Sequence, residues 1–223
     1  MNNASPSRAE PQLVLTADGS FTLLDLQSGA HYHSIHGARS ESEHVFIRGG
    51  EVAHRLALKP SLAVLEIGLG TGLNALLTIL EAQKAAKPLK YTAYEPFPVR
   101  RELLEAFYAG QSDLQPFLSL LIEPTAKLEG VDFDLRIAHW VPATEPEPVF
   151  DIVYFDLFAK TVEPDFWQAP VLARLLEWCK PGGCLVSYGI TGELKRGLKA
   201  MGIPFDRPKG FAAKREMLRV FKP

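Results

Sequence analysis

Three closely spaced glycines follow an acid in the chain, where Glu66, Gly68, Gly70 and Gly72 form the pattern E-x-G-x-G-x-G. The backbone N–H groups of such a turn, between a strand and a helix, can receive a polar ligand. The dinucleotide fingerprint G-x-G-x-x-G needs its third glycine at position 73, which is leucine. An acid beside a pyrophosphate would also bring two anions together, whereas an ammonium group or backbone amides suit it. The pattern therefore argues against a dinucleotide-dependent dehydrogenase.

A second acid, Glu95, stands 23 residues after Gly72, at the end of the next predicted strand. An acid at this place can bridge the two hydroxyls of a ribose. With Glu66 and the glycines, it resembles the cofactor turn of class I S-adenosylmethionine-dependent methyltransferases. The resemblance implies S-adenosyl-L-methionine as the cofactor. The alternative is a plain glycine turn with two surface acids.

Charge is unevenly distributed along the chain. The net charge is −2, but the segment 195–223 holds nine basic residues against Asp206 and Glu216 and so carries +7. A local basic surface on an otherwise acidic protein favours an anionic partner, nucleic acid above all. The alternative is a solvated helix face followed by a strand whose charges point outward.

Strands that alternate with helices must position these groups. An Asp18-Gly19 turn between alternating apolar residues predicts a hairpin over 12–26, followed by a polar, irregular stretch and a helix near 49–58. From residue 61 the pattern predicts strands at 61–67, 91–95, 133–138, 151–156, 184–188 and 216–221, and helices at 74–83, 99–108, 166–179 and 191–201. This order predicts an α/β fold, a Rossmann-like, mostly parallel sheet with an antiparallel last strand. We expect residues 1–60 to form an N-terminal extension that packs on a main domain at 61–223.

Composition excludes several other classes. With 223 residues and 47% hydrophobic residues the chain can bury one sizeable core, which excludes a disordered or low-complexity protein. Two cysteines without partners at zinc spacing exclude a disulfide scaffold and a cysteine-rich zinc module. No apolar stretch has the length of a membrane span, and the first ten residues lack the apolar core of a signal peptide. We therefore expect a cytoplasmic protein without membrane contact.

Several longer motifs carry a closer resemblance. They are T-x-D-G-S (16–20), Y-H-S-x-x-G-A-x-x-E-S-x-H-V-F (32–46), E-x-G-x-G-T-G-L-N (66–74), Y-E-x-F-P (94–98), V-Y-F-D-L-F-A with P-D-F-W behind it (153–167) and K-G-F-A-A-K-R-E-M-L (209–218). Together they make almost the whole chain similar to the tRNA 5-methylaminomethyl-2-thiouridine methyltransferase family, the methyltransferase half of bifunctional MnmC. The resemblance implies methyl transfer to the amine of 5-aminomethyl(-2-thio)uridine at the tRNA wobble position. The bifunctional form adds a flavin-dependent domain, for which this chain is too short, so we expect the stand-alone version without FAD.

The resemblance and the chemistry together define candidate site residues. Methyl transfer to an amine needs in-line positioning, exclusion of water and a neutral nitrogen. Asp156, at the end of a strand, is the candidate acceptor for the amine proton; its alternatives are a helix cap or an ion pair with Lys160. The expected cofactor-binding residues are Glu66, Gly68, Gly70, Gly72, Asn74, Glu95, His139 and Asp156. The expected substrate-binding residues are Tyr32, Ser34, Phe158 and Trp167 around an extruded base, and Lys209, Lys214 and Arg215 at phosphates of the anticodon region.

Three departures from the family pattern fall near this site. Leu157 and Lys160 replace the glycine and proline of the usual D-G-F-A-P, and Ala212 alters G-F-G-x-K-R. Ala138-His139 replaces a Gly-Asp whose acid commonly meets the adenine amino group, a contact that passes to His139 or a backbone carbonyl.

Alternatives remain at this stage. His31, His33, His36 and His44 with Glu41 and Glu43 contain enough ligands for a metal, but methyl transfer needs none and we expect none. A methyltransferase of a small molecule or protein would share the fold, with the basic tail serving solubility. A nucleotide-binding module without catalysis would fit the altered residues after the strands. The sequence leaves the oligomeric state open, and we expect a monomer.

Overall fold

The computed structural model describes residues 9–123, 125–141, 147–212 and 214–222. Two expectations fall partly outside these ranges: the polar start of the chain, at residues 1–8, and Ala213 of the 209–218 motif. Among the described helices, none is long and apolar enough to cross a membrane.

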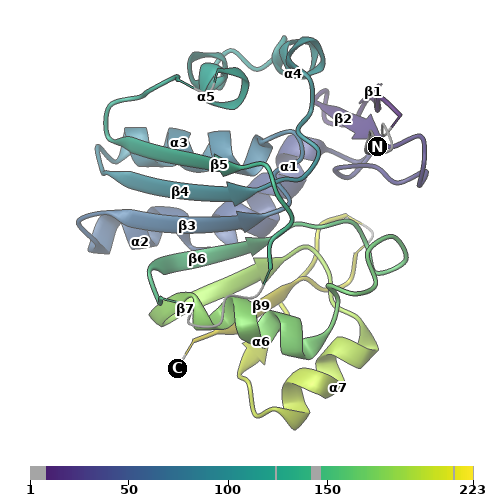
Figure 1. The fold of residues 1–223 in the computed structure, drawn as a ribbon, viewed down its shortest axis with the longest axis vertical. Helices are drawn as coiled ribbons and strands as arrows, with labels where there is room; N and C mark the ends of the chain where they lie inside the picture. Colours follow the sequence, from purple (N-terminus) through teal and green to yellow (C-terminus); the bar gives the residue numbers. More distant parts are fainter. Residues whose placement is uncertain (1–8, 124, 142–146, 213, 223) are drawn as a thin grey trace, which may run out of the picture.

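A seven-stranded sheet forms the centre of the molecule, in the order β5-β4-β3-β6-β7-β9-β8 (Figure 1). The five strands from β5 to β7 run parallel, whereas β9 pairs antiparallel with both β7 and β8. Their bounds are β3 (Leu62–Ile67), β4 (Leu89–Tyr94), β5 (Val131–Arg136), β6 (Phe150–Phe155), β7 (Cys179–Ser187), β8 (Phe205–Asp206) and β9 (Leu218–Phe221). The expected α/β fold with a mostly parallel sheet and an antiparallel last strand is confirmed.

Helices cover both faces of this sheet. Because side chains alternate along a strand, Leu62 and Val64 of β3 pack into one apolar cluster, whereas Leu65 and Ile67 pack into the other. The first cluster lies against α3 (Leu73–Lys84) and the N-terminal helical segments, and the second against α6 (Ala169–Glu177) and α7 (Gly192–Ala200). Burial on both faces explains why β3 and β6 are mostly apolar rather than alternating, with Glu66 and Asp151 as their buried acids.

The N-terminal residues complete one end of the molecule. The hairpin of β1 (Gln12–Leu15) and β2 (Phe21–Leu24) forms around Asp18-Gly19 as expected and lies near the ends to which the arrows of β3 and β4 point (Figure 1). Three helical segments follow it: α1 (Ala38–Ser42), η1 (Glu43–Arg48) and α2 (Val52–Leu58). Side chains of η1 and α2 belong to the first core cluster, so this region shares a core with the sheet. The division of the chain at residue 60 stays a prediction.

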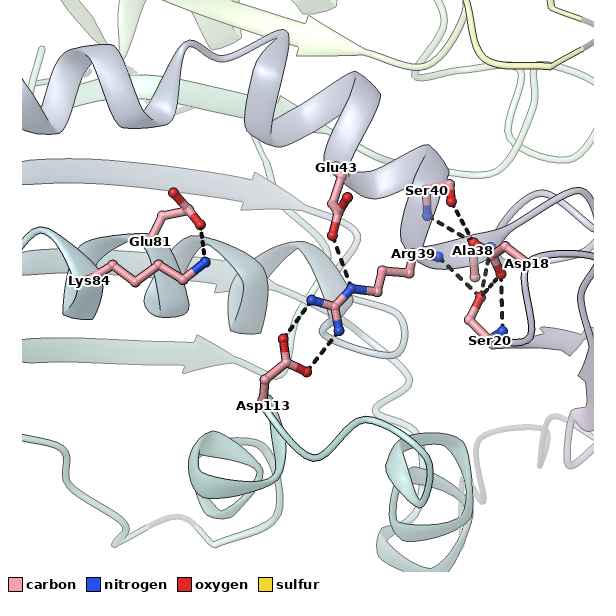
Figure 2. Close-up of polar contacts among 9 residues, drawn as sticks. All are labelled: Asp18, Ser20, Ala38, Arg39, Ser40, Glu43, Glu81, Lys84 and Asp113. Atoms are coloured by element: carbon pink, nitrogen blue, oxygen red, sulfur yellow. Dashed lines mark hydrogen bonds and ion pairs between the residues drawn. The ribbon is translucent and has the colours of Figure 1, made fainter.

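The helix at 38–48 differs from the expected irregular stretch, and distant residues explain it. Figure 2 shows that the hairpin turn reaches the start of α1: Ser20 Oγ accepts from the backbone N–H groups of Ala38 and Arg39, and Asp18 Oδ2 accepts from that of Ser40. These bonds satisfy N–H groups that a helix leaves without internal partners. The cap comes from residues about 20 positions earlier, so local sequence does not reveal it.

Three smaller helical segments of the described chain lie in the connection between β4 and β5. They are the helices α4 (Arg101–Tyr108) and α5 (Ser119–Ile122) and the short η2 (Gln115–Phe117). Arg39 of α1 donates to both carboxylate oxygens of Asp113 in this connection, at 2.8 and 2.6 Å (Figure 2). The N-terminal region is thereby also attached to the segment that follows α4.

Candidate active site

A cavity of about 390 Å³ lies at the carboxyl ends of the central strands. The strand ends are hydrogen-bonded together there, because Gly68 N donates to Tyr94 O and Asp156 N donates to Ile67 O. The N-terminal residues Tyr32 and Ser34 line the opposite side. A cavity of this size at the switch point of a doubly wound sheet is where such folds bind small ligands.

The glycine turn brings the backbone close to this cavity. Gly68 has φ +88°, and a Cβ there would lie 2.5 Å from the carbonyl oxygen of Asp156. Gly70 has φ +54°, and a Cβ there would lie 3.1 Å from the ring of Tyr32. Both glycines line the cavity, whereas Gly72 stands behind them at the start of α3. A side chain at position 68 would therefore force apart the two strand ends that form the floor.

Glu95 closes the turn from the neighbouring strand. Its Oε2 accepts from Gly70 N at 2.9 Å, and its Oε1 accepts from Phe97 N at 2.8 Å. Each carboxylate oxygen keeps a further lone pair, and the side chain lines the cavity. Glu95 can therefore accept hydrogen bonds from a diol while holding the turn in place.

Asn74, Glu66 and Asp156 form a hydrogen-bonded group beneath the cavity. Asn74 Nδ2 donates to Glu66 Oε1 at 2.9 Å and to Asp156 Oδ2 at 2.7 Å. Glu66 is fully buried and also accepts from the hydroxyl of Tyr91, and it does not line the cavity. Burial, followed by the charge of Asp156, raises the pKa of Glu66 well above its ordinary value.

Asp156 lines the cavity directly and has a strongly shifted pKa. Burial and then the charge of Glu41 raise its pKa to about 7, against the lowering influence of Asn74 and Lys214. Lys160, the alternative ion-pair partner expected from the sequence, pairs with Glu193 instead. A carboxyl group with a pKa near neutrality can exchange a proton with a ligand under ordinary conditions.

Aromatic side chains form the walls. Phe158 packs edge-on against Tyr32, with ring centroids 5.1 Å apart, and both rings line the cavity. Trp167 is buried behind this wall, where its Nε1 donates to Phe158 O and its ring packs on Phe155 and Tyr188. The structure therefore brings Phe158 to the cavity and leaves Trp167 as support for it.

The far end of the cavity suits a nucleoside. His139 lies at the rim with its ring against Phe97. Beside it, Trp140 lines the cavity with a buried Nε1 that has no hydrogen-bond partner in the described part of the chain. A buried donor without an acceptor is costly unless a ligand supplies one, and an adenine ring has acceptor nitrogens. The diol-accepting Glu95, this donor and the open glycine turn together fit an adenosyl group.

Several cavity-lining residues were missed as site residues by the sequence interpretation, among them His33, Glu41, Trp140, Glu163 and Tyr188. Glu41 and Tyr188 line the cavity near Asp156. His33 also lines it, and its Nε2 shares a hydrogen bond of 2.8 Å with Thr71 Oγ1. The motif 32–46 contains His33 and Glu41, so its dense polar residues were the available signal. Among the described residues, no group of three or more His, Cys, Asp or Glu side chains is arranged to hold a metal ion.

The basic residues near the C-terminus separate into two groups. Lys195 and Arg207 pair with Glu216, Arg219 pairs with Asp206 and Glu51, and Lys214 pairs with Glu41 inside the cavity. Arg196, Lys199, Lys209 and Arg215 are exposed, and none forms an ion pair within the described ranges. The structure therefore separates Lys214, at the cavity, from Lys209 and Arg215 at the surface.

Comparison with known proteins agrees with this geometry. Residues 125–223 match a family model described as S-adenosyl-L-methionine-dependent methyltransferase. The tRNA 5-methylaminomethyl-2-thiouridine biosynthesis bifunctional protein MnmC of Acinetobacter baylyi is 33% identical over 92% of this chain and 36% of its own length. The protein of the same name from Magnetococcus marinus is 30% identical over 85% of this chain and 30% of its own length. The chain thus spans about a third of the length of these relatives.

A solved structure supports the fold. The crystal structure of MNMC2 from Aquifex aeolicus superposes with a TM-score of 0.78 and 20% identity, over 98% of this chain and 73% of that chain. The likeness extends over the N-terminal elements as well as the sheet. In its sequence matches this chain is similar to S-adenosyl-L-methionine-dependent methyltransferases and to the matched part of the MnmC proteins, and its fold is that of the MNMC2 structure.

Proposed function

We propose that this protein transfers a methyl group from S-adenosyl-L-methionine to the amine of 5-aminomethyl(-2-thio)uridine at the wobble position of tRNA, which gives the 5-methylaminomethyl product. The names of the MnmC relatives support the choice of nucleoside. Action on tRNA would place the protein in the cytoplasm. The observation that carries the proposal is the position of Asp156: it lines the cavity between the glycine turn and the wall of Tyr32 and Phe158.

The chain's residues divide between two ends of the cavity. Glu95, Trp140 and the glycine turn would hold the ribose, adenine and amino-acid end of the cofactor, with His139 at the rim. The bound cofactor supplies an electrophilic methyl group on a sulfonium. Tyr32 and Phe158 would contact the extruded uracil ring at the other end, as an enzyme that acts on a base must take it out of its stack.

Asp156 acts on the nucleophile. An alkylammonium cannot attack, because its nitrogen lone pair is bound to a proton. The Asp156 carboxylate would take that proton and so free the nitrogen lone pair, while the bound cofactor would supply the methyl group and keep the electron pair of the broken carbon–sulfur bond. Asn74 orients the carboxylate through the 2.7 Å hydrogen bond and keeps it from rotating away. The aromatic walls exclude water during the displacement.

Transfer RNA would lie over the surface beside the cavity. Lys209 and Arg215, with Arg196 and Lys199 on α7, would contact phosphates of the anticodon region and position the RNA without reading its sequence. Of the three residues expected to contact phosphates, Lys214 alone lines the cavity, so we do not assign it to a phosphate contact.

A labelling experiment tests the function. Protein and labelled S-adenosyl-L-methionine are incubated with tRNA from cells that lack the final wobble methylation, and digested nucleosides are analysed by mass spectrometry. We expect label in 5-methylaminomethyl(-2-thio)uridine with wild type and none with Asp156→Asn. Label in small amines or proteins but not in tRNA would overturn the choice of substrate.

A further inference from the structure

One cation inside the cavity stands out: the ammonium group of Lys214. Its Nζ lies 2.8 Å from Glu41 Oε1 and 3.9 Å from the centre of the Tyr188 ring. All three side chains line the cavity, although they come from α1, from the residue after β7 and from the loop before β9. Glu41 is nearly buried, with 7% of its side chain exposed, whereas 41% of the Lys214 side chain is exposed.

The receiving groups are fixed independently of the lysine. Glu41 Oε2 accepts from the backbone N–H of Ser34 at 2.7 Å, so the carboxylate keeps its orientation when Lys214 moves. The Tyr188 ring packs against Trp167, with ring centroids 5.6 Å apart. A fixed carboxylate beside an aromatic face is a binding site for ammonium groups, through a charge-assisted hydrogen bond and a cation–π contact.

The surrounding charge favours a second cation over an anion. Asp156 and Glu163 also line this part of the cavity. After burial, the charges of Asp156, Glu41 and Glu163 all raise the pKa of Tyr188, so the three acids act on the same ring. Among the described residues, the positive charge of Lys214 lowers the pKa of Asp156.

We propose that Glu41 and the Tyr188 ring form the subsite for the primary ammonium of the substrate, and that Lys214 fills this subsite until the substrate displaces it. The proposal rests on the function proposed above, because it places the aminomethyl group there. A substrate –CH₂–NH₃⁺ group has the same chemistry as the end of a lysine side chain. The half-exposed stem of Lys214 can swing into solvent, because the loop has other attachments. Lys209 O accepts a hydrogen bond of 2.7 Å from His44 Nε2, and Glu216 pairs with Lys195 and Arg207.

Displacement also delivers the amine to its base. Glu41 raises the pKa of Asp156 and Lys214 lowers it, so both groups lie within electrostatic range of that carboxyl. An ammonium bound at Glu41 and Tyr188 therefore lies in the same cavity as Asp156 and within its electrostatic range, and Asp156 can take its proton before methyl transfer. Glu41 and Lys214 would thus act on recognition of the amine, and Asp156 on the reaction.

Binding of two matched nucleosides tests the subsite. The probes are 5-aminomethyluridine, charged at about pH 7, and the neutral 5-hydroxymethyluridine, titrated into the full chain saturated with S-adenosylhomocysteine. Lys214→Met removes the competing charge and should bind the amine about tenfold more tightly than wild type. Glu41→Gln should bind the amine about tenfold more weakly. Affinity for the hydroxymethyl compound should stay unchanged in both variants.

Controls separate recognition from a merely structural role. Lys90→Met removes an exposed cation on β4 that does not line the cavity, and should leave both affinities as in wild type. If Lys214 only fastened the loop, Lys214→Met would weaken both probes alike, which would overturn the proposal. Unfolding temperatures and S-adenosylhomocysteine affinity report whether Glu41→Gln is intact; should it fail to fold, Tyr188→Leu takes its place and should lose the preference for the charged probe.

The same preparations distinguish this proposal from the proposed function. If wild-type protein prefers the amine in a way that depends on Glu41 but places no label in tRNA, the proposed tRNA substrate is wrong and the proposed ammonium subsite stands. Label in tRNA from a protein whose affinities show no dependence on Glu41 or Lys214 would overturn the subsite alone.

Discussion

Asn74 and Asp156, 82 positions apart in the sequence, are joined by a hydrogen bond of 2.7 Å from Nδ2 to Oδ2 at the floor of the cavity. The same amide donates to buried Glu66, so one side chain holds two acids on neighbouring strands. The bond lowers the pKa of Asp156, whereas burial and Glu41 raise it. The side chain of Asn74 therefore sets both the direction and the proton affinity of the proposed base.

Replacing Asn74 by alanine should move the pH dependence of methyl transfer. Without the amide the pKa of Asp156 rises above about 7, so more of the carboxyl is protonated and inactive at neutral pH. We expect kcat/KM to fall several-fold at neutral pH and to recover at higher pH. Profiles of kcat/KM against pH for wild type and Asn74→Ala measure the shift.

Thr78→Val is the matched control for this variant. Thr78 lies one turn later on α3 and bonds to Asn74 O rather than to the acids. It should lose stability without moving the midpoint of the profile. An unchanged midpoint in Asn74→Ala would contradict the assigned role of the amide.

Asp156→Asn should stabilise the protein at alkaline pH while abolishing methyl transfer. The carboxyl has a folded pKa of about 7 against an ordinary value of 3.8, so the folded state holds its proton more strongly. Its contribution to stability is therefore present below about pH 4 and is lost as the pH rises through 7. We expect the advantage of the variant over wild type to grow by about 4 kcal/mol between pH 4 and pH 8, because each pKa unit between 3.8 and about 7 corresponds to about 1.4 kcal/mol.

Urea denaturation of the ligand-free protein at several pH values measures this difference. Asp132→Asn, at an exposed position of β5, is the control and should show no such trend. A gain for Asp156→Asn that is equal at both ends of the pH range would contradict the raised pKa.

Glu95→Ala should weaken cofactor binding. The substitution removes the proposed ribose acceptors and the groups that hold Gly70 N and Phe97 N. We expect the affinity for S-adenosylhomocysteine to fall by about 10- to 100-fold, which corresponds to the loss of two hydrogen bonds. Calorimetric titration measures it, with Glu102→Ala, an exposed acid on α4, as the control. Equal affinity in the two variants would remove Glu95 from the cofactor site.

The double variant Lys209→Glu and Arg215→Glu should bind tRNA more weakly and with less dependence on salt. Both side chains are exposed beside the cavity, and each lost phosphate contact lowers the slope of log affinity against log salt by about 0.7–0.9. Filter binding over a range of salt concentrations measures the slope. Lys90→Glu changes an exposed residue near the start of β4, at the end of the strand away from the cavity, and should leave the slope unchanged. An equal slope in wild type and in the double variant would show that the RNA binds to another surface.

Much of the scaffold follows from local sequence. The strand, the glycine turn and the helix over 61–84 can be predicted because a buried strand is mostly apolar and a close backbone approach needs glycine. The antiparallel direction of the last strand could be predicted because the segment just before it has no helical pattern, whereas a parallel crossover usually contains a helix. Asp156 and Glu95 could be proposed for the cavity because parallel strands end at one edge of a sheet.

Tertiary structure alone decided the rest. The helix at 38–48 depends on caps from Asp18 and Ser20 across a loop, and the pairing of Glu41 with Lys214 joins positions 173 residues apart. A basic residue in a basic tail looks like a phosphate contact, and only packing shows that one such ammonium lies on Tyr188 inside the cavity. Periodicity and glycine spacing encode elements through local backbone geometry, whereas the neighbours of a polar side chain depend on how whole layers pack together.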